Sequence, residues 1–192
     1  MLTNPPTPHW LMTQARPLLD KWKNKQEKVE RLSWDDYFFL QAYLVSNRSL
    51  DAQTKCGAIL ISPEKDIIST GYNSFVRNID DTVLPNLRDE KYPFFLHAEH
   101  NAILACARHG KKCKGSILYV TGPPCINCLQ LISQAGISEI YYLNHNIHNG
   151  HEKEKGVWNI LVSLLSDNLR LIKIEPSKKL LKNIASIQNL SV

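Results

Sequence analysis

The chain has no long apolar run. Its 192 residues, 43% of them hydrophobic, contain no stretch near the ~20 apolar residues that a membrane-spanning helix needs. The first ten residues, MLTNPPTPHW, have neither the basic start nor the continuous apolar run of a secretory signal. We therefore expect a cytoplasmic protein with no membrane partner, whose thiols stay reduced.

A dense basic stripe is also missing from the centre of the chain. The formal net charge is +5, but residues 32–150 carry ten basic and eleven acidic groups, a net of −1. The excess of positive charge therefore belongs to the two ends. A polynucleotide reader normally shows a basic surface around its site, so this distribution favours a small substrate over a nucleic acid.

Cysteines are few, and their placement is uneven. Cys56, Cys106 and Cys113 stand alone, whereas Cys125 and Cys128 are three residues apart. In a reducing compartment such a pair indicates metal or redox chemistry rather than a disulfide.

The length allows one domain with extensions, and no internal repeat is present. We divide the chain into a basic N-terminal arm (1–31), a central domain (32–175) and a C-terminal helix (176–192). In the arm, a polar and basic helix is expected over roughly 11–31, starting near Pro17.

Helices and strands alternate through the remainder of the chain, which predicts an α/β layered domain around a mixed sheet of about five strands. The segment 73–96 is too long for an ordinary connection and is a candidate substrate loop. The expected elements are a helix from Ser33, strands at 56–61 and 67–72, a helix at 97–109, a strand at 117–121, a helix at 125–135, a strand at 137–143, a helix at 157–165, a strand at 169–174 and a helix at 178–187.

Two short segments, His97-Ala98-Glu99 and Pro124-Cys125-Ile126-Asn127-Cys128, each open an expected helix. The partial positive charge of a helix N-terminus stabilises thiolates there. Residues i and i+3 share a helix face, so both sulfurs can reach one metal ion.

These residues suit a catalytic zinc site. Zinc takes four tetrahedral ligands, and a catalytic site leaves one position for water. His97, Cys125 and Cys128 supply three ligands, and the ion can lower the pKa of the water to about 7. Glu99 is not needed as a ligand and is free to move protons.

Other interpretations of these residues exist. By itself, a Cys-x-x-Cys pair is as typical of a structural zinc knuckle or a redox pair, taken together, as of a catalytic metal site. A closed structural site would use His97 and His100 with the two cysteines, but Glu99 would then have no purpose. A second metal is conceivable at three loop histidines, although solvated loop histidines are commoner; these are His145, His148 and His151.

Hydrolytic deamination of a nucleobase needs these parts and few others, and His-x-Glu followed by Pro-Cys-x-x-Cys is the signature of zinc deaminases. The chain resembles the cytidine and deoxycytidylate deaminase superfamily, specifically its deoxycytidylate (dCMP) branch. The resemblance covers roughly residues 33–175. The matching stretches are Gln41–Ser46, Gly57–Ile59, Ile67–Asn73, His97–Glu99 with Asn101–Leu104, and Tyr119–Thr121 leading to Pro124-Cys125 and Cys128.

This resemblance implies a three-layer α/β/α fold and the reaction of dCMP with water to give dUMP and ammonia, which supplies dUMP for thymidylate synthesis. It implies that His97, Cys125 and Cys128 bind Zn²⁺ and that Glu99 is the proton shuttle. It further implies that Asn73 hydrogen-bonds the sugar or base of a nucleotide, and that the backbone N–H of Ala98 recognises the pyrimidine carbonyl. Related enzymes form homo-oligomers, often hexamers, and the apolar helix at 157–165 suits such an interface.

Three residues are candidates for binding the phosphate of the nucleotide. Arg48 and Ser49, just before the first strand, are candidates, and Arg108 suits either a phosphate or a subunit contact. The loop after Gly71-Tyr72-Asn73 departs from the family, which usually has glycine where Ser74 stands. Because this loop contributes to control by dCTP and dTTP in several members, the resemblance does not carry such regulation over.

Three alternative functions remain open at this point. One is a dCTP or bifunctional dCMP/dCTP deaminase. Another is a deaminase acting on cytosine or adenine in RNA or single-stranded DNA, with the basic ends as phosphate contacts. The third is a non-catalytic, zinc-stabilised binding module, for which Glu99 would be dispensable.

Overall fold

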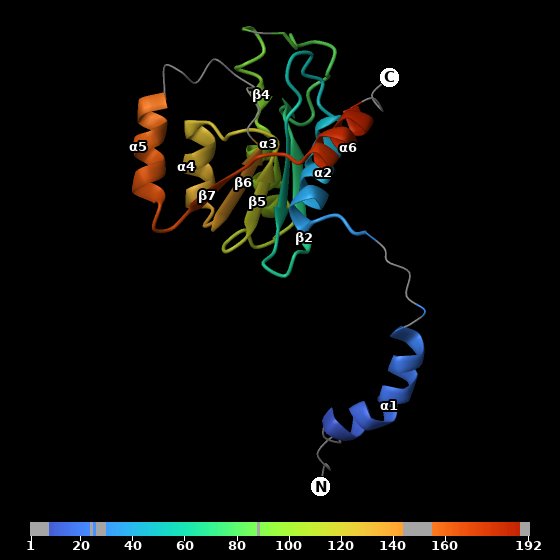
Figure 1. The fold of residues 1–192 in the computed structure, drawn as a ribbon. Helices are drawn as coiled ribbons and strands as arrows, with labels where there is room; N and C mark the ends of the chain where they lie inside the picture. Colours follow the sequence, from blue (N-terminus) through green and yellow to red (C-terminus); the bar gives the residue numbers. More distant parts are fainter. Residues whose placement is uncertain (1–7, 24, 26–29, 88, 144–154, 189–192) are drawn as a thin grey trace. The chain divides into compact units, whose positions relative to one another are not determined.

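The computed structural model describes residues 8–23, 25, 30–87, 89–143 and 155–188 (Figure 1). The chain divides into two compact units, Met1–Leu32 and Ser33–Val192. Within the described ranges, no helix is both long enough and apolar enough to cross a membrane.

The first unit contains the helix α1 (Pro8–Lys23). The prediction of its start was wrong, because Pro17 lies inside the helix instead of near its beginning. A proline inside a helix removes one backbone hydrogen bond, and α1 nevertheless continues beyond Pro17 to Lys23. The predicted end was also too late, since residues 30–32 are not helical.

The second unit is built on a five-stranded sheet with the strand order β2-β1-β5-β6-β7. The predicted mixed sheet is confirmed: two of its pairings are antiparallel and two are parallel. The strands are β1 (Gly57–Ile61), β2 (Ile67–Tyr72), β5 (Ile117–Val120), β6 (Glu139–Leu143) and β7 (Arg170–Ile174).

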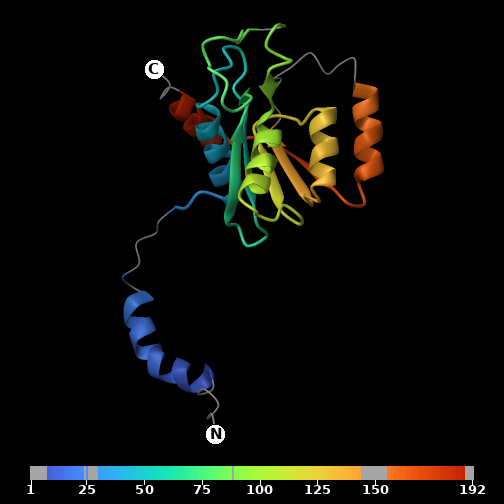
Figure 2. The ribbon, with the colours of Figure 1, turned by 180° about the vertical axis from the view of Figure 1, so that it is seen from behind.

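Helices cover both faces of this sheet, which confirms the expected three layers (Figures 1 and 2). On one face, α2 (Trp34–Ser46) and α6 (Lys178–Gln188) share a core that includes Phe38 and Leu180. On the other face lie α3 (Ala98–Arg108), α4 (Ile126–Gln134) and α5 (Lys155–Leu165), whose apolar residues form the second core. The C-terminal helix is therefore part of the packed unit.

Local sequence signals explain where several helices begin and end. Ser33 caps α2, and its Oγ accepts a hydrogen bond from the backbone N of Asp36 at 3.0 Å. Gly110 and Gly136 follow α3 and α4 with φ angles of +61° and +73°. Glycine adopts this left-handed conformation without steric cost, so both helices stop where the sequence predicts.

The long segment after β2 is closed at its base by a second, two-stranded sheet. β3 (Ser74–Phe75) pairs antiparallel with β4 (Phe95–Leu96). The rings of Phe75 and Phe95 meet edge-on with their centroids 4.4 Å apart. The candidate substrate loop is thus residues 76–94, held at both ends beside α3.

β2 and α3 contact each other backbone to backbone at Gly71. A Cβ atom added to Gly71 would lie 2.2 Å from the carbonyl oxygen of Ala98 and 2.4 Å from the backbone N of Ala102. Only glycine permits this approach. The contact fixes the first turn of α3 directly against the end of β2.

Replacing Gly71 with alanine is expected to lower the free energy of unfolding by about 2 kcal/mol or more, because the new methyl group overlaps backbone atoms that have no alternative rotamer. For a domain of this size the Tm falls by about 4 °C or more. Gly156→Ala is the matched control: nothing lies within 4 Å of the added Cβ, and alanine favours the α5 helix. Thermal unfolding followed by circular dichroism compares the two, and equal Tm values would contradict the close contact.

Candidate functional site

Two helices begin at the same edge of the large sheet. His97 is the N-cap of α3, and Cys125 is the N-cap of α4. α3 follows β4, whereas α4 follows β5, whose last residue Val120 pairs with Ala58 at the start of β1. Segments that are far apart in the sequence therefore meet at one point.

Three possible metal ligands gather there. The Nδ1 atom of His97 lies 3.3 Å from the Sγ of Cys128 and 3.5 Å from the Sγ of Cys125. All three donor atoms lie within 4.8 Å of one another. In tetrahedral zinc sites with bonds of about 2.0–2.3 Å, neighbouring donors are about 3.5 Å apart. The donor set and its spacing therefore fit a zinc ion with little movement.

His100 does not join this group. Its ring is stacked near that of His97, with the centroids 6.0 Å apart. Among the described residues, the group of close donors consists of His97, Cys125 and Cys128. The arrangement has three protein ligands and not the four of a closed structural site.

Glu99, at the start of α3, is only 5% exposed. Burial raises the pKa of its carboxyl group, and the positive charge of His97 opposes this shift. A carboxyl group with a raised pKa beside the donor group is suited to take up and release a proton.

The thiols of the two cysteines have pKa values shifted in opposite directions. A hydrogen bond from the Cys128 thiol, helped by His97, lowers the pKa of Cys125 to about 3. The same hydrogen bond and burial raise the pKa of Cys128. The backbone N of Cys128 also donates to the Sγ of Cys125 at 3.4 Å. The start of α4 therefore stabilises a negative sulfur at Cys125.

Asn73 follows β2 and is 7% exposed. Its Nδ2 donates to the Oδ2 of Asp51 at 3.0 Å and to the carbonyl of Thr54 at 2.9 Å. Its Oδ1 accepts from the backbone N of Cys56 at 2.7 Å. Both amide hydrogens of Asn73 are used within the protein. The side chain can therefore form one more hydrogen bond, in which the second lone pair of Oδ1 is the acceptor.

The turn that carries Asn73 is anchored to α3 by Asn101. The Nδ2 of Asn101 donates to the carbonyl of Tyr72 at 2.8 Å and to the Oγ of Ser74 at 3.1 Å. Ser74, which stands where the family usually has glycine, thus contributes its side chain to this anchor. The role of Asn101 was missed from the sequence, where it was only part of a matching stretch.

Two further side chains fix the start of α4. The Oγ1 of Thr121 accepts from the backbone N of Gly57 at 3.2 Å. The indole Nε1 of Trp158, on α5, donates to the carbonyl of Pro124 at 2.9 Å. The sequence analysis assigned the helix at 157–165 to a subunit interface and missed this contact of Trp158, although a tryptophan in an apolar helix needs a partner for its N–H.

The three candidate phosphate-binding residues lie in different surroundings. Arg48 is exposed in the segment between α2 and β1, whereas Ser49 is buried and its Oγ accepts from the backbone N of Asp51 at 3.2 Å. Arg108 lies in the last turn of α3, about 15 Å along the helix from Ala98. The structure therefore does not bring Arg108 to the donor group, and the side chain of Ser49 shapes its own loop.

The other cysteines do not join the donor group. Cys56 lies next to Thr121, and burial raises the pKa of its thiol to about 12. Cys106 is buried against Ser69, and Cys113 is partly buried nearby. The alternative second metal site lies outside the described residues, since its three histidines fall within 144–154.

Residues 32–144 match the family model of the cytidine and deoxycytidylate deaminase zinc-binding region. The chain belongs to this family. The match includes all four residues of the site, and the deaminase signature that predicted it lies on the starts of α3 and α4.

The chain is also similar to individual family members. It is 35% identical over 133 residues to human deoxycytidylate deaminase, covering 66% of this chain and 74% of the human protein. It is 37% identical over 118 residues to the ComE operon protein 2 of Bacillus subtilis, covering 59% and 61% of the two chains.

A solved structure shows the same fold. The dCMP deaminase of the cyanophage S-TIM5, crystallised in complex with dCMP and dUMP, superposes with a TM-score of 0.61 at 26% identity. The superposition covers 76% of this chain and all of the phage protein.

Proposed function

We propose that this deaminase hydrolyses dCMP to dUMP and ammonia, and so supplies dUMP for thymidylate synthesis. The observation that carries the proposal is the triangle of His97, Cys125 and Cys128 donors beside the buried Glu99. The preference for dCMP is supported by the relatives named deoxycytidylate deaminase and by the phage enzyme that binds dCMP and dUMP. The need for reduced thiols favours a cytoplasmic location.

His97, Cys125 and Cys128 would hold the zinc ion. When bound, zinc supplies the activation of a water molecule for attack on C4 of the cytosine ring. The protein contributes three ligands from two helix starts, and the fourth position stays available.

Glu99 would carry the protons of the reaction. Its carboxylate accepts a proton from the attacking water and delivers one to N3, which allows the ring to accept the electron pair. It then takes the second proton from the new C4 hydroxyl and delivers it to the departing amine, so that the C4–N bond breaks, the C4 carbonyl forms and ammonia leaves. Its raised pKa suits a group that must change protonation twice in each turnover.

The nucleotide would be oriented by two groups beside Glu99. The first N–H groups of a helix have no partner within it, so the backbone N–H of Ala98 can donate to the C2 carbonyl of the pyrimidine. Asn73 offers only an acceptor, so it must meet a donor. Apart from its phosphate, dCMP has two donors, the 4-amino group at the reacting carbon and the 3′-hydroxyl. We therefore assign the 3′-hydroxyl to Asn73.

The phosphate would then lie toward Arg48. The segment between α2 and β1 carries both Arg48 and Asp51, the residue that binds Asn73. Arg108 is about a helix length from the site and suits a subunit contact better.

The assigned ligands predict the metal content of the protein. Elemental mass spectrometry of the purified protein should find about one zinc ion per chain. Cys128→Ala removes a ligand and is expected to weaken zinc binding by at least about 100-fold, because even the loss of an outer partner costs 10- to 100-fold. Cys113→Ala is the matched control and should keep its zinc. Equal zinc content in both variants would contradict the assigned ligands.

Turnover tests the reaction itself. The wild-type protein should release ammonia from dCMP, and Glu99→Gln should lower kcat by about 100-fold or more while zinc content stays the same, since glutamine keeps the shape but cannot carry protons. An unchanged rate would favour a non-catalytic zinc module.

A substrate panel distinguishes the remaining alternatives. It comprises dCMP, dCTP, cytidine, deoxycytidine, single-stranded DNA and RNA. Preference for dCTP would identify a dCTP or bifunctional enzyme. Conversion only within a strand, with steep salt dependence of binding, would identify a polynucleotide deaminase.

We further propose that the enzyme assembles as a homo-oligomer through α5. One side of this helix packs on the core through Trp158 and Leu161. An adjacent stripe stays exposed: Val157 is 58%, Ile160 61% and Leu164 75% accessible. A second copy of the chain is the partner that the family members' assembly suggests, as a hexamer or a smaller ring.

A charge on this stripe is expected to break the assembly. Leu164→Glu should lower the mass measured by light scattering after size exclusion, whereas Asn159→Glu, an equal charge on the same helix away from the stripe, should not. A monomeric wild-type protein, or two variants of equal mass, would contradict the interface.

A further inference from the structure

A buried ion pair lies beside the candidate site. The Nζ atom of Lys91 contacts the Oδ1 atom of Asp51, and the two side chains are 3% and 5% exposed. The residues come from different segments: Asp51 lies between α2 and β1, and Lys91 lies in the 76–94 loop. An ion pair this deep is costly unless its geometry and its hydrogen bonds are well satisfied.

The Asp51 carboxylate is surrounded by donors. Oδ1 accepts from the backbone N atoms of Gln53 and Thr54, each at 2.9 Å, and from Lys91. Oδ2 accepts from the Nδ2 of Asn73 at 3.0 Å. An ionised carboxylate can only accept hydrogen bonds, and all four groups around Asp51 are donors.

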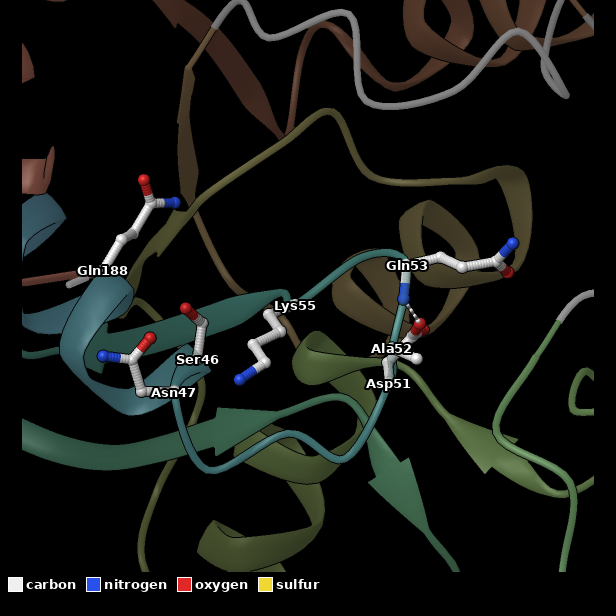
Figure 3. A pocket seen from close by; sticks show the side chains of 7 residues that line it. All are labelled: Ser46, Asn47, Asp51, Ala52, Gln53, Lys55 and Gln188. Carbon is white, nitrogen blue, oxygen red and sulfur yellow. Dashed lines mark hydrogen bonds between the residues drawn. The ribbon is translucent and has the colours of Figure 1, made fainter. Parts of the chain in front are cut away.

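The Asp51 carboxylate binds donors within the protein and does not point into the neighbouring pocket. Asp51 borders a pocket of about 270 Å³ between the end of α2, residues 51–55 and Gln188. Figure 3 shows the carboxylate turned to the backbone amide of Gln53, while Lys55 extends into the pocket. The pocket lining includes none of the four residues assigned to zinc and proton transfer.

Asp51, which Lys91 holds in place, is one of three groups that set which way the Asn73 amide faces, together with the Thr54 carbonyl and the Cys56 N–H. With its oxygens accepting, Asp51 requires the NH₂ group of Asn73 on its side. The Oδ1 of Asn73 must then face the backbone N of Cys56, at 2.7 Å. If the amide flipped, its oxygen would meet the Asp51 carboxylate and the Thr54 carbonyl, and its NH₂ would meet the N–H of Cys56.

Lys91 is itself held from several sides. Its Nζ lies 5.9 Å from the ring centroids of Tyr92 and Phe95, within range of a cation–π interaction. Phe95 belongs to β4, which pairs with β3 immediately after Asn73. A second contact, from the Nδ2 of Asn86 to the carbonyl of Leu50 at 3.3 Å, joins the same two segments.

We propose that Lys91 and Asp51 are a positioning pair for nucleotide recognition: together they present the Oδ1 of Asn73 as an acceptor for the 3′-hydroxyl of the substrate. This rests on the proposed function. Neither residue touches the reacting atoms, so the pair acts on binding and leaves the chemistry of Glu99 and the metal ligands unchanged.

The test compares dCMP with 2′,3′-dideoxycytidine monophosphate, which lacks the 3′-hydroxyl. For Lys91→Met, the KM for dCMP is expected to rise about tenfold, the effect of losing one hydrogen bond to the ligand, with kcat within about threefold of wild type. The KM for the dideoxy nucleotide should change less than about twofold, because that contact is already missing. Lys91→Arg should recover most of the affinity for dCMP, and Lys112→Met, the same change at an exposed lysine, should resemble wild type.

The double variant Asp51→Asn/Lys91→Met separates positioning from stability. It removes both buried charges, so its Tm should recover relative to Lys91→Met. The KM of the double variant for dCMP should nevertheless stay raised. The side-chain oxygen of the asparagine introduced at position 51 would accept from the two backbone amides, so the NH₂ group of that asparagine would face the NH₂ group of Asn73. If Lys91→Met does not fold, this variant carries the test.

Several outcomes would overturn the positioning pair. These are an unchanged KM for dCMP, an equal loss for both nucleotides, or a double variant in which Tm and KM recover together. A wild-type protein without dCMP turnover would instead refute the proposed function, so the two failures are distinguishable.

Discussion

The central constraint on this structure is that three donor atoms from two distant chain segments must lie about 3.5 Å apart. The Nδ1 of His97 lies 3.3 Å and 3.5 Å from the two sulfurs because α3 and α4 start at the same edge of the sheet. The contact at Gly71 fixes α3 against β2, and the hydrogen bond from Trp158 to the Pro124 carbonyl fixes the start of α4. The two hydrophobic cores on either side of the sheet hold these anchors in place.

Two buried carboxylates lie near this edge, and their surroundings give them opposite properties. Asp51 is matched by Lys91 and by three further donors, so its charge is fully compensated. Glu99 is buried without such a set, and burial raises its pKa. A carboxylate saturated with donors is suited to hold structure, whereas one with a perturbed pKa is suited to exchange protons.

The sequence predicted the features that depend on neighbouring residues. Ser33, Gly110 and Gly136 mark helix ends by local backbone chemistry, and the mixed sheet follows from the alternation of helices and strands. The start of α1 was wrong, because the preference of proline for a first turn is only a tendency.

The positions of side chains that meet across the fold were not predictable in the same way. The spacing of His97, Cys125 and Cys128 identified the donors because their residue types are rare and specific. Asp51 and Lys91 are common residue types 40 positions apart, and no periodicity connects them. A lysine next to Tyr92 and close to Phe95 in a polar loop is the one local sign that it is buried.

The Sγ of Cys125 serves two purposes, because it accepts the backbone N–H of Cys128 as the cap of α4 and is also one of the three donors. Removing the sulfur of Cys125 would therefore take away the cap of α4 and a donor atom together, so the stability of this helix start and the geometry of the donor group are linked through one atom.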